Sequence, residues 1–258
     1  MSEKSSVLAE VPAQNREANI PSPTPNPSEN QSFTSRAWNH MLEDVRPSGF
    51  VEFELVFLTF CTGIQDAISF PEYHCFASNQ TGNTVFLVLA LVLPWLDGDN
   101  FYVSNIGAAL GFFLLGGWLT GQTLLVFAAA ALQLRYGVMP QGKVAVAVVG
   151  LLAFASGSQV VQSRSMKMTE ISTAMATAAW VDLVIDPKLF QARNRPRTRR
   201  IMFLLALVAG SLLGAGIYRV AGSAVAVFIS AAGKFVVTVM YLFNSADKAR
   251  KIEGEANC

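Results

Sequence analysis

A polar stretch between two strongly apolar runs carries the side chains best suited to chemistry in this chain. It reads Asn79-Gln80-Thr81-Gly82-Asn83, and Asp66 lies thirteen residues before it, next to Gln65. Polar groups at membrane depth are costly unless a partner satisfies them, so such a cluster favours a site. Its amide and hydroxyl groups suit a polar neutral or zwitterionic ligand, and Asp66 could titrate as a proton-coupling group. Helix capping and structural hydrogen bonds are the alternative explanation.

A weaker copy of this pattern follows about a hundred residues later. Gln159 takes the place of Gln65, and the threonines Thr173 and Thr177 take the place of the first polar stretch. A symmetric pair of buried amides suggests a central polar site, although hydrogen bonding between helices would explain the glutamines almost as well.

Charged side chains also lie inside apolar segments. Lys234 lies near the middle of the last segment, too deep to reach water easily. We expect it to face the bundle and to pair with Asp66 or Asp182. A buried ion pair is as often structural as functional. Asp186, four residues after Asp182, could simply meet Lys188.

Other kinds of chemistry are not predicted. The three cysteines are widely spaced and give neither a metal-ligand spacing nor a disulfide framework. We find no nucleophile with a base and an acid, no phosphate loop and no metal-ligand cluster, so no enzyme, cofactor or metal is predicted. The basic cluster is short and flanked by apolar segments, which argues against nucleic acid. Asn30 begins an N-glycosylation pattern.

The elements that position these residues are apolar segments of membrane-spanning length. The chain is 52% hydrophobic and 14% charged, with a mean hydropathy of +0.39, whereas a soluble domain carries about a quarter charged residues. We predict an all-α, polytopic transmembrane helix bundle of about seven helices in a lipid bilayer, with six to eight as the range. At roughly 18–20 residues per crossing, the segments are 51–70, 80–96, 101–134, 143–161, 171–185, 201–218 and 222–243.

The run 101–134 contains no charged residue and leaves the topology open. Two crossings there would put the N-terminus inside and make the two halves parallel, whereas one crossing would put it outside and invert them. The loop from Lys188 to Arg200 is rich in arginine, so the positive-inside rule places it and the C-terminus in the cytoplasm. That assignment leaves the Arg164–Lys167 turn on the other side.

Four regions follow from this pattern. Residues 1–50 are polar and Pro-rich and are predicted to be disordered. Residues 51–134 and 135–243 form the first and second halves of the transmembrane region, and 244–258 form a polar C-terminal tail.

The two halves show a weak internal similarity. Gly63-Ile64-Gln65-Asp66 corresponds to Gly157-Ser158-Gln159-Val160. Internal repeats are typical of transporters, which bind substrate near the repeat interface. The halves also contain Gly-xxx-Gly pairs, which let helices pack closely and could support a homo-oligomer. These pairs are Gly107/Gly111, Gly117/Gly121 and Gly210/Gly214.

Together, these motifs resemble the YoaK-like family of multipass membrane proteins, a domain of unknown function. The resemblance covers roughly residues 54–244 and rests on Gly63-x-x-Asp66-Ala67, Phe76-x-x-Asn79-x-Thr81-Gly82-Asn83 and Gly157-x-Gln159. It implies the membrane fold but no activity. The polar N-terminal tail and Trp180-Val181-Asp182-Leu183 resemble the fungal form. The chain departs from the pattern at Val160 and Ala178, so the second site could be weaker. The 101–134 run also looks short, which suggests a shortened first half.

We therefore predict a multipass protein of the plasma membrane or an endomembrane that transports an unknown small molecule through a polar site at the repeat interface. Two alternatives stay open. One is a membrane-embedded enzyme or accessory protein of specialised metabolism, and the other is a scaffold without transport activity.

Overall fold

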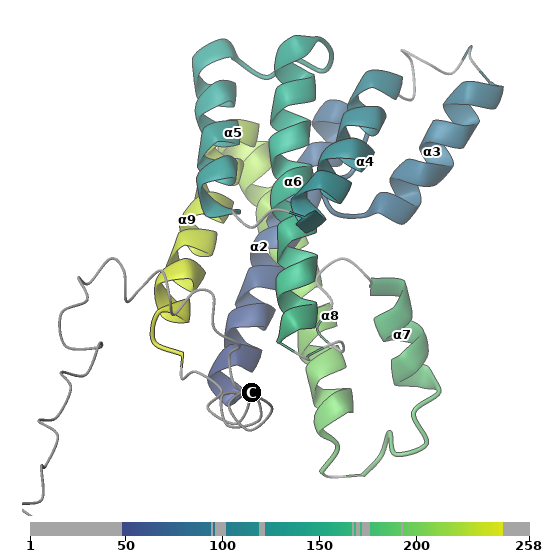
Figure 1. Ribbon diagram of the computed structural model, residues 1–258, viewed down its shortest axis with the longest axis vertical. Coiled ribbons are helices and arrows are strands. Elements are labelled where there is room, and N and C mark those ends of the chain that lie inside the picture. Colours follow the sequence, from purple (N-terminus) through teal and green to yellow (C-terminus); the bar gives the residue numbers. More distant parts are fainter. Residues whose placement is uncertain are drawn as a thin grey trace, which may run out of the picture.

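The computed structural model describes residues 48–93, 95, 102–118, 122–166, 168, 171, 176–191 and 193–244. Eight helices make up the regular structure of these residues (Figure 1). They are α2 (Gly49–Tyr73), α3 (Gln80–Val92), α4 (Val103–Trp118), α5 (Thr123–Tyr136), α6 (Lys143–Ser165), α7 (Ala176–Val184), α8 (Arg195–Ala221) and α9 (Ser223–Tyr241). The predicted all-α fold is confirmed, and the open run 101–134 contains two helices, α4 and α5.

Four of these helices, α2, α6, α8 and α9, are long and apolar enough to cross a membrane. The helices α3, α4 and α5 are apolar but shorter, and α7 has only 9 residues. Large apolar side chains on α8 face outward, with Leu205, Leu212 and Val220 exposed by 63%, 70% and 88%. An apolar surface of this extent fits lipid rather than water. The chain is therefore an integral membrane helical bundle.

After α2 the chain folds back into the bundle. His74 ends the helix in the left-handed conformation, with φ of 52°, and its N–H donates to the carbonyl of Phe70 at 2.9 Å. Ser78 N then donates to Asp66 Oδ1 at 2.9 Å, so α3 begins beside the interior of α2. The ring of Phe86, further along α3, lies 5.9 Å from the ring of Phe70. The helix α3 therefore runs in the same direction as α2 and is re-entrant, so the predicted crossing at 80–96 is wrong.

The helix α7 makes a similar return at the opposite end of the bundle, beside the first turns of α8 (Figure 1). Its Asp182 lies 3.4 Å from Arg200, in the second turn of α8. These nine residues span about 14 Å, less than half of a bilayer core, so the described part of the predicted segment 171–185 is too short to cross. The residues after α6 join the starts of α2 and α8 in one buried cluster, which contains Met166, Met168, Ile171, Val51, Leu55, Phe203 and Leu204.

These returns decide the relative directions of the long helices. Asn105 Nδ2 donates to the carbonyl of Tyr73, at the end of α2, and to that of Pro140, just before α6. The end of α6 lies by the start of α2, so α2 and α6 run in opposite directions. We predicted that two helices in 101–134 would make the halves parallel. The opposite directions of α2 and α6 contradict that prediction, which had counted 80–96 and 171–185 as crossings.

The start of α2 and the residues after α9 lie on the same side of the bundle as the arginine-rich loop. This side is called the basic end below. Arg199 Nη2 lies 2.6 Å from Glu52 Oε1, which joins the starts of α8 and α2. Asn244 Nδ2 donates to Glu54 Oε2 at 2.7 Å, which brings the residues after α9 to the same place. Arg164 lies in the last turn of α6, and Met166, just after the helix, packs with the starts of α2 and α8. This segment therefore also lies at the basic end, not on the opposite side as predicted.

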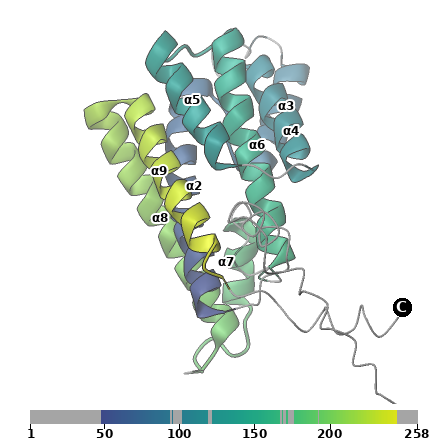
Figure 2. The same cartoon turned by 60° about the vertical axis from the view of Figure 1, so that its left-hand side comes forward.

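Two pairs of helices pack closely and run in the same direction, α2 with α8 and α4 with α6. Figure 2 shows α8, α2 and α9 side by side. Glycines make these approaches possible, because a Cβ on Gly210 would overlap the carbonyl of Phe60, and one on Gly157 would overlap that of Phe113.

The glycines differ in what they contact. Gly210 and Gly214 pack against α2 within the chain, and Gly116, rather than Gly117, makes the close approach to α6. A methyl group on Gly107 or Gly111 would have no described atom within 4 Å, which leaves that pair for contact with lipid or with another protein. Gly121 lies outside the described residues.

Candidate functional site

A polar stripe runs along one face of α2 through the interior of the bundle. It consists of Thr62, Gln65, Asp66 and Ser69, spaced by three and four residues, so their side chains share one face of the helix. Thr62, Gln65 and Ser69 are buried and Asp66 is half-buried. Only Gln65 and Asp66 were predicted from the sequence. The helical spacing of the four residues was the signal that could have found Thr62 and Ser69.

A chain of hydrogen bonds joins α2, α6 and α9 at the level of Thr62. Lys234 Nζ donates to Gln159 Oε1 at 2.9 Å, and Gln159 Nε2 donates to Thr62 Oγ1 at 2.9 Å. Gln159 Nε2 also lies 3.5 Å from the carbonyl of Leu58. Lys234 and Gln159 are 0% exposed. The three side chains therefore form a buried polar centre between three long helices.

Lys234 faces the bundle, but its partner differs from the predicted one. Among the described residues its ammonium donates to the neutral amide of Gln159 and forms no ion pair. Asp66 bonds instead to Ser78, and Asp182 lies at the basic end with Arg200. The predicted ion pair of Lys234 with Asp66 or Asp182 is therefore wrong, because neither carboxylate bonds to the ammonium. The charges of Asp66 and Lys234 still interact.

Gln65 lies one helical turn from Thr62 and is 0% exposed. Neither its Nε2 nor its Oε1 has a hydrogen-bond partner among the described residues. An unpaired buried amide costs about 1–3 kcal/mol. A group of this kind calls for a specific explanation, such as an ordered water or a bound molecule.

Asp66 holds the returning loop against α2. Its Oδ1 accepts from Ser78 N at 2.9 Å, and its other oxygen accepts from the hydroxyl of Ser78. One turn further on, Ser69 Oγ accepts from Ala77 N at 3.1 Å. Both oxygens of Asp66 therefore accept hydrogen bonds from the loop. This is a structural role, which the sequence left open as the alternative to proton coupling.

Asn83 and Gln80 also hold the loop. The amide of Asn83 pairs with both backbone groups of Phe76, accepting from N and donating to O at 2.8 Å each. Asn83 Nδ2 donates to Gln80 Oε1 at 2.9 Å, and Gln80 Nε2 donates to the carbonyl of Ala77 at 3.1 Å. These side chains complete the turn that α3 needs in order to begin inside the bundle.

Asn79 and Thr81 are exposed at the start of α3. Asn79 is the N-cap, and its Oδ1 accepts from Gly82 N at 3.3 Å. Gly82 lies inside α3, so it does not break the helix; a Cβ there would lie 3.2 Å from the ring of Phe76. The first polar stretch thus makes the capping contacts that were the alternative explanation of its sequence.

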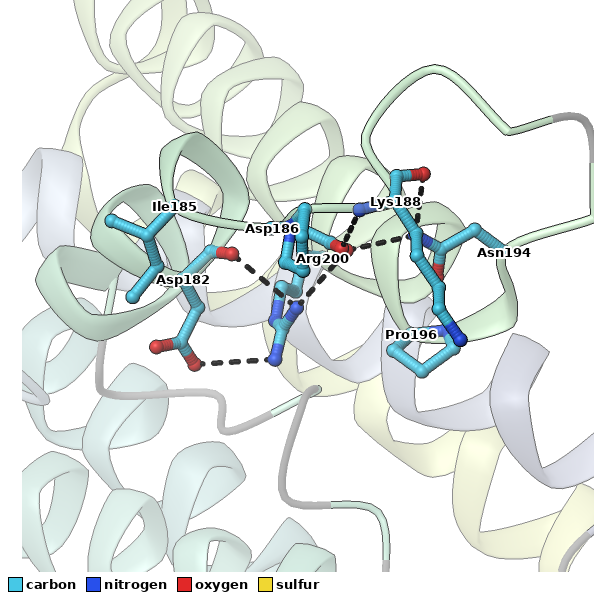
Figure 3. A pocket seen from close by; sticks show the side chains of 8 residues that line it. Asp182, Ile185, Asp186, Lys188, Asn194, Pro196 and Arg200 are labelled. Carbon is cyan, nitrogen blue, oxygen red and sulfur yellow. Dashed lines mark hydrogen bonds and ion pairs between the residues drawn. The ribbon is translucent and has the colours of Figure 1, made fainter.

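The second polar stretch contributes no described residue to the polar centre. Thr173 lies outside the described residues, as does Asn30, and Thr177 is exposed on α7. Asp182 lies at the basic end in a depression of about 380 Å³ between α7 and α8 (Figure 3). The depression is lined by Asp182, Ile185, Asp186, Pro187, Lys188, Asn194, Pro196 and Arg200.

The charges in this depression satisfy one another. Arg200 lies between Asp182 and Asp186, at 3.4 Å and 3.7 Å (Figure 3). Hydrogen bonds from the Asn194 amide and the Lys188 backbone N–H, both at 2.8 Å, lower the pKa of Asp186. The set therefore fixes the turn between α7 and α8.

Two further polar groups were not predicted from the sequence and lie toward the ends of the bundle. Glu54 is 2% exposed and bonds to Asn244 at the basic end. At the opposite end, Gln133 Nε2 donates to the hydroxyls of Tyr73 at 2.7 Å and Ser223 at 3.1 Å. Polar side chains therefore lie between α2 and α9 at three depths: near the basic end, at the polar centre and near the opposite end.

Comparison with known proteins gives a family but no individual relative. A family model described as "Protein of unknown function (DUF1275)" matches residues 55–240, from the first turns of α2 to the end of α9. No curated protein and no solved structure matches the chain. The predicted resemblance to YoaK-like membrane proteins is consistent with this match, whereas the fungal type stays a prediction.

Proposed function

The chain belongs to the DUF1275 family, and from its geometry we propose that it is a transporter, a permease that moves a small polar molecule across a membrane. The observation that carries the proposal is Gln65, a fully buried amide with no partner among the described residues, one turn from the buried Lys234–Gln159–Thr62 chain. Unsatisfied polar groups inside a membrane bundle are costly, and they mark substrate and ion pathways.

An inverted repeat is the second part of the proposal. Exchanging α2 with α6, α3 with α7, α4 with α8 and α5 with α9 turns most of the helix contacts of the bundle into one another, although the contact between α8 and α9 has no comparable counterpart between α4 and α5 among the described residues. The pair α2–α8 becomes α6–α4, α2–α9 becomes α6–α5, and α3–α4 becomes α7–α8. Transporters with inverted repeats bind substrate near the membrane midplane, at the repeat interface, with the help of discontinuous helices. Gln65 and Gln159 occupy equivalent positions in this arrangement.

The two re-entrant helices would act as gates. The α3 side is held by the bonds between Asp66 and Ser78, and the α7 side by the ion pairs of Arg200. Releasing one set while keeping the other would open the polar centre to one side of the membrane at a time. Alternating access of this kind requires no movement of the centre itself.

We also propose that the basic end faces the cytoplasm. The arginine-rich loop, the last turn of α6 with Arg164 and both ends of the bundle lie there, whereas the opposite end carries Arg135, Lys143 and Arg219. The larger number of basic residues at the basic end favours the cytoplasm by the positive-inside rule. A glycosylation acceptor inserted between Gly137 and Gly142 is expected to be modified. One inserted after Lys188 is expected to stay unmodified, as is Asn30. Modification after Lys188, measured by a glycosidase-sensitive mobility shift, would reverse the orientation.

Transport itself is tested by comparing small molecules inside and outside cells. The cells would make the wild-type protein, the Gln65→Met variant or neither, with equal amounts of both proteins in the membrane. Gln65 is chosen because it has no structural partner to lose among the described residues. We expect the inside-to-outside ratio of one compound to change with the wild type only. A change in total amount at constant ratio would favour an enzyme or accessory protein, and no change would favour a scaffold.

A further inference from the structure

We propose that the ligand of the polar centre is a small organic acid that carries a hydroxyl or amino group next to its carboxylate. Lys234 would bind the carboxylate, and Gln65 would bond to the neighbouring group. This inference rests on the proposed function, because it names the class of molecule that the same site would carry.

The first argument is the unbalanced charge of Lys234. An ammonium group has three N–H donors, and the described residues give this one a single acceptor, the neutral Oε1 of Gln159. The carboxylate of Asp66 interacts with Lys234 through its charge, but both of its oxygens already accept from Ser78. The thiol of Cys61 is the other titratable group that interacts with Lys234. Two donors of a buried cation are thus left for an incoming acceptor.

More distant acids do not balance this charge. Glu54 is bonded to Asn244, which lies beyond the end of α9 at Tyr241, and the helix alone rises about 10 Å from Lys234 to Tyr241. Asp182 and Asp186 pair with Arg200 at the basic end. A buried cation without an ion pair favours an anionic ligand and disfavours a cationic one. A single cation suits one carboxylate better than a phosphate or a diacid.

The second argument is the free amide of Gln65, which is independent of the charge. The amide offers two N–H donors and one carbonyl acceptor, and none of them is used within the described residues. The carbonyl would accept from a hydroxyl or amino group, while Nε2 donates to the adjacent carboxylate. An acid without a neighbouring donor would leave the buried carbonyl unpaired, at the cost of one hydrogen bond, or about tenfold in affinity.

The third argument is size. The side chains near the centre on α2 and α9 are small, and the two helices lie close together there. The hydroxyl of Ser230 donates to the carbonyl of Cys61, and Gly233 packs directly against the Cys61 sulfur. Two cavities among the described residues lie elsewhere, one at the basic end and one of about 220 Å³ among Phe53, Val56, Phe57, Phe60 and Ala206. Because α2 and α9 pack this closely beside the centre, a ligand there would have only a few heavy atoms.

Binding to the purified full-length protein in detergent tests the inference. The probes are two- to four-carbon 2-hydroxy acids, the same acids without the hydroxyl, their neutral amides, and ethanolamine as a cation. Apparent affinity follows from the rise of the melting temperature with probe concentration. We expect at least one hydroxy acid to bind about tenfold more tightly than its plain acid, and we expect the amides and ethanolamine to produce no shift.

The variants separate the two contacts. Gln65→Met should bind a hydroxy acid and its plain acid equally, because the group that distinguishes them is gone. Lys234→Arg should still bind acids, and Lys234→Met should not. If Lys234→Met fails to fold, the comparison with Gln65→Met still decides, because Gln65 has no bonds to lose among the described residues. Stabilisation by the amides or by ethanolamine, or no shift with any acid, would overturn the inference.

Failure of this inference can be told apart from failure of the proposed function. Binding of acids without any movement across a vesicle membrane would remove the transporter proposal and keep the ligand class. Movement of a neutral or cationic compound that depends on Gln65 would keep the transporter and remove the acid.

Discussion

Replacing Gln65 with Met is expected to raise the melting temperature of the ligand-free protein, whereas the same replacement at Gln159 is expected to lower it. Both glutamines are 0% exposed, and each stands two residues after a glycine, Gly63 or Gly157. Gln65 has two unpaired polar atoms, and a thioether of similar volume removes a penalty of about 1–3 kcal/mol. Gln159 bonds to Lys234 and Thr62, so its loss removes a buried hydrogen bond to a charged group, which costs about 1.5–3 kcal/mol.

The measurement is thermal unfolding in detergent, followed by the fluorescence of the four tryptophans. Each variant is the other's control, because the chemical change is identical and only the bonding differs. If Gln65→Met loses as much stability as Gln159→Met, then Gln65 has a structural partner and is not free for a ligand. If the stabilised Gln65→Met variant also loses transport, the unpaired amide is kept for function at the expense of stability.

Replacing Gly157 with Ala is expected to destabilise the bundle, whereas replacing Gly111 with Ala is not. A methyl group on Gly157 would overlap the backbone carbonyl of Phe113, and a backbone cannot turn away as a side chain can. Overpacking of this kind costs about 1–3 kcal/mol, and more when helices must separate. Gly111 lies on α4, the helix that Gly157 faces, but it has open space around it, so alanine there gains up to about 1 kcal/mol of helix propensity.

The same unfolding assay compares the two alanine variants. Gly210→Ala on α8 should behave like Gly157→Ala, because a methyl there would meet the carbonyl of Phe60. Equal stability of the Gly157 and Gly111 variants would contradict the close parallel packing of α4 and α6. A loss of stability or of oligomer size with Gly111→Ala would show that its open face binds another protein.

The positions of the helices were predictable from the sequence because hydrophobic length and bounding polar residues are local properties. Predicted segments such as 143–161 and 222–243 match α6 and α9 within a few residues. Their topology was not predictable in this way, because a hydropathy window cannot distinguish a re-entrant helix from a crossing. The difference for α3 rests on bonds between Asp66 and Ser78, twelve residues apart, which hydropathy does not encode.

The polar centre was predictable only in part. Gln65, Gln159 and Lys234 stand out because polar residues are rare in such segments, and the structure places Gln159 and Lys234 in direct contact. The hydrogen-bond partner of Lys234 could not be predicted, because it depends on which carboxylates are already bonded to residues of the loops. Asp182 illustrates this limit, since it shares the apolar context of Lys234 in the sequence but pairs with Arg200 at the basic end.

The central claim is that the chain moves a small molecule through the polar centre, and vesicles that contain only the purified protein test it most directly. They would be given a labelled 2-hydroxy acid and compared with empty vesicles and with vesicles that contain folded Gln65→Met protein. We expect uptake into wild-type vesicles well above that of empty ones, and little or no excess with the variant. Uptake at the level of empty vesicles, with acids, amides and amines alike, would contradict a transporter and leave a scaffold or an accessory protein.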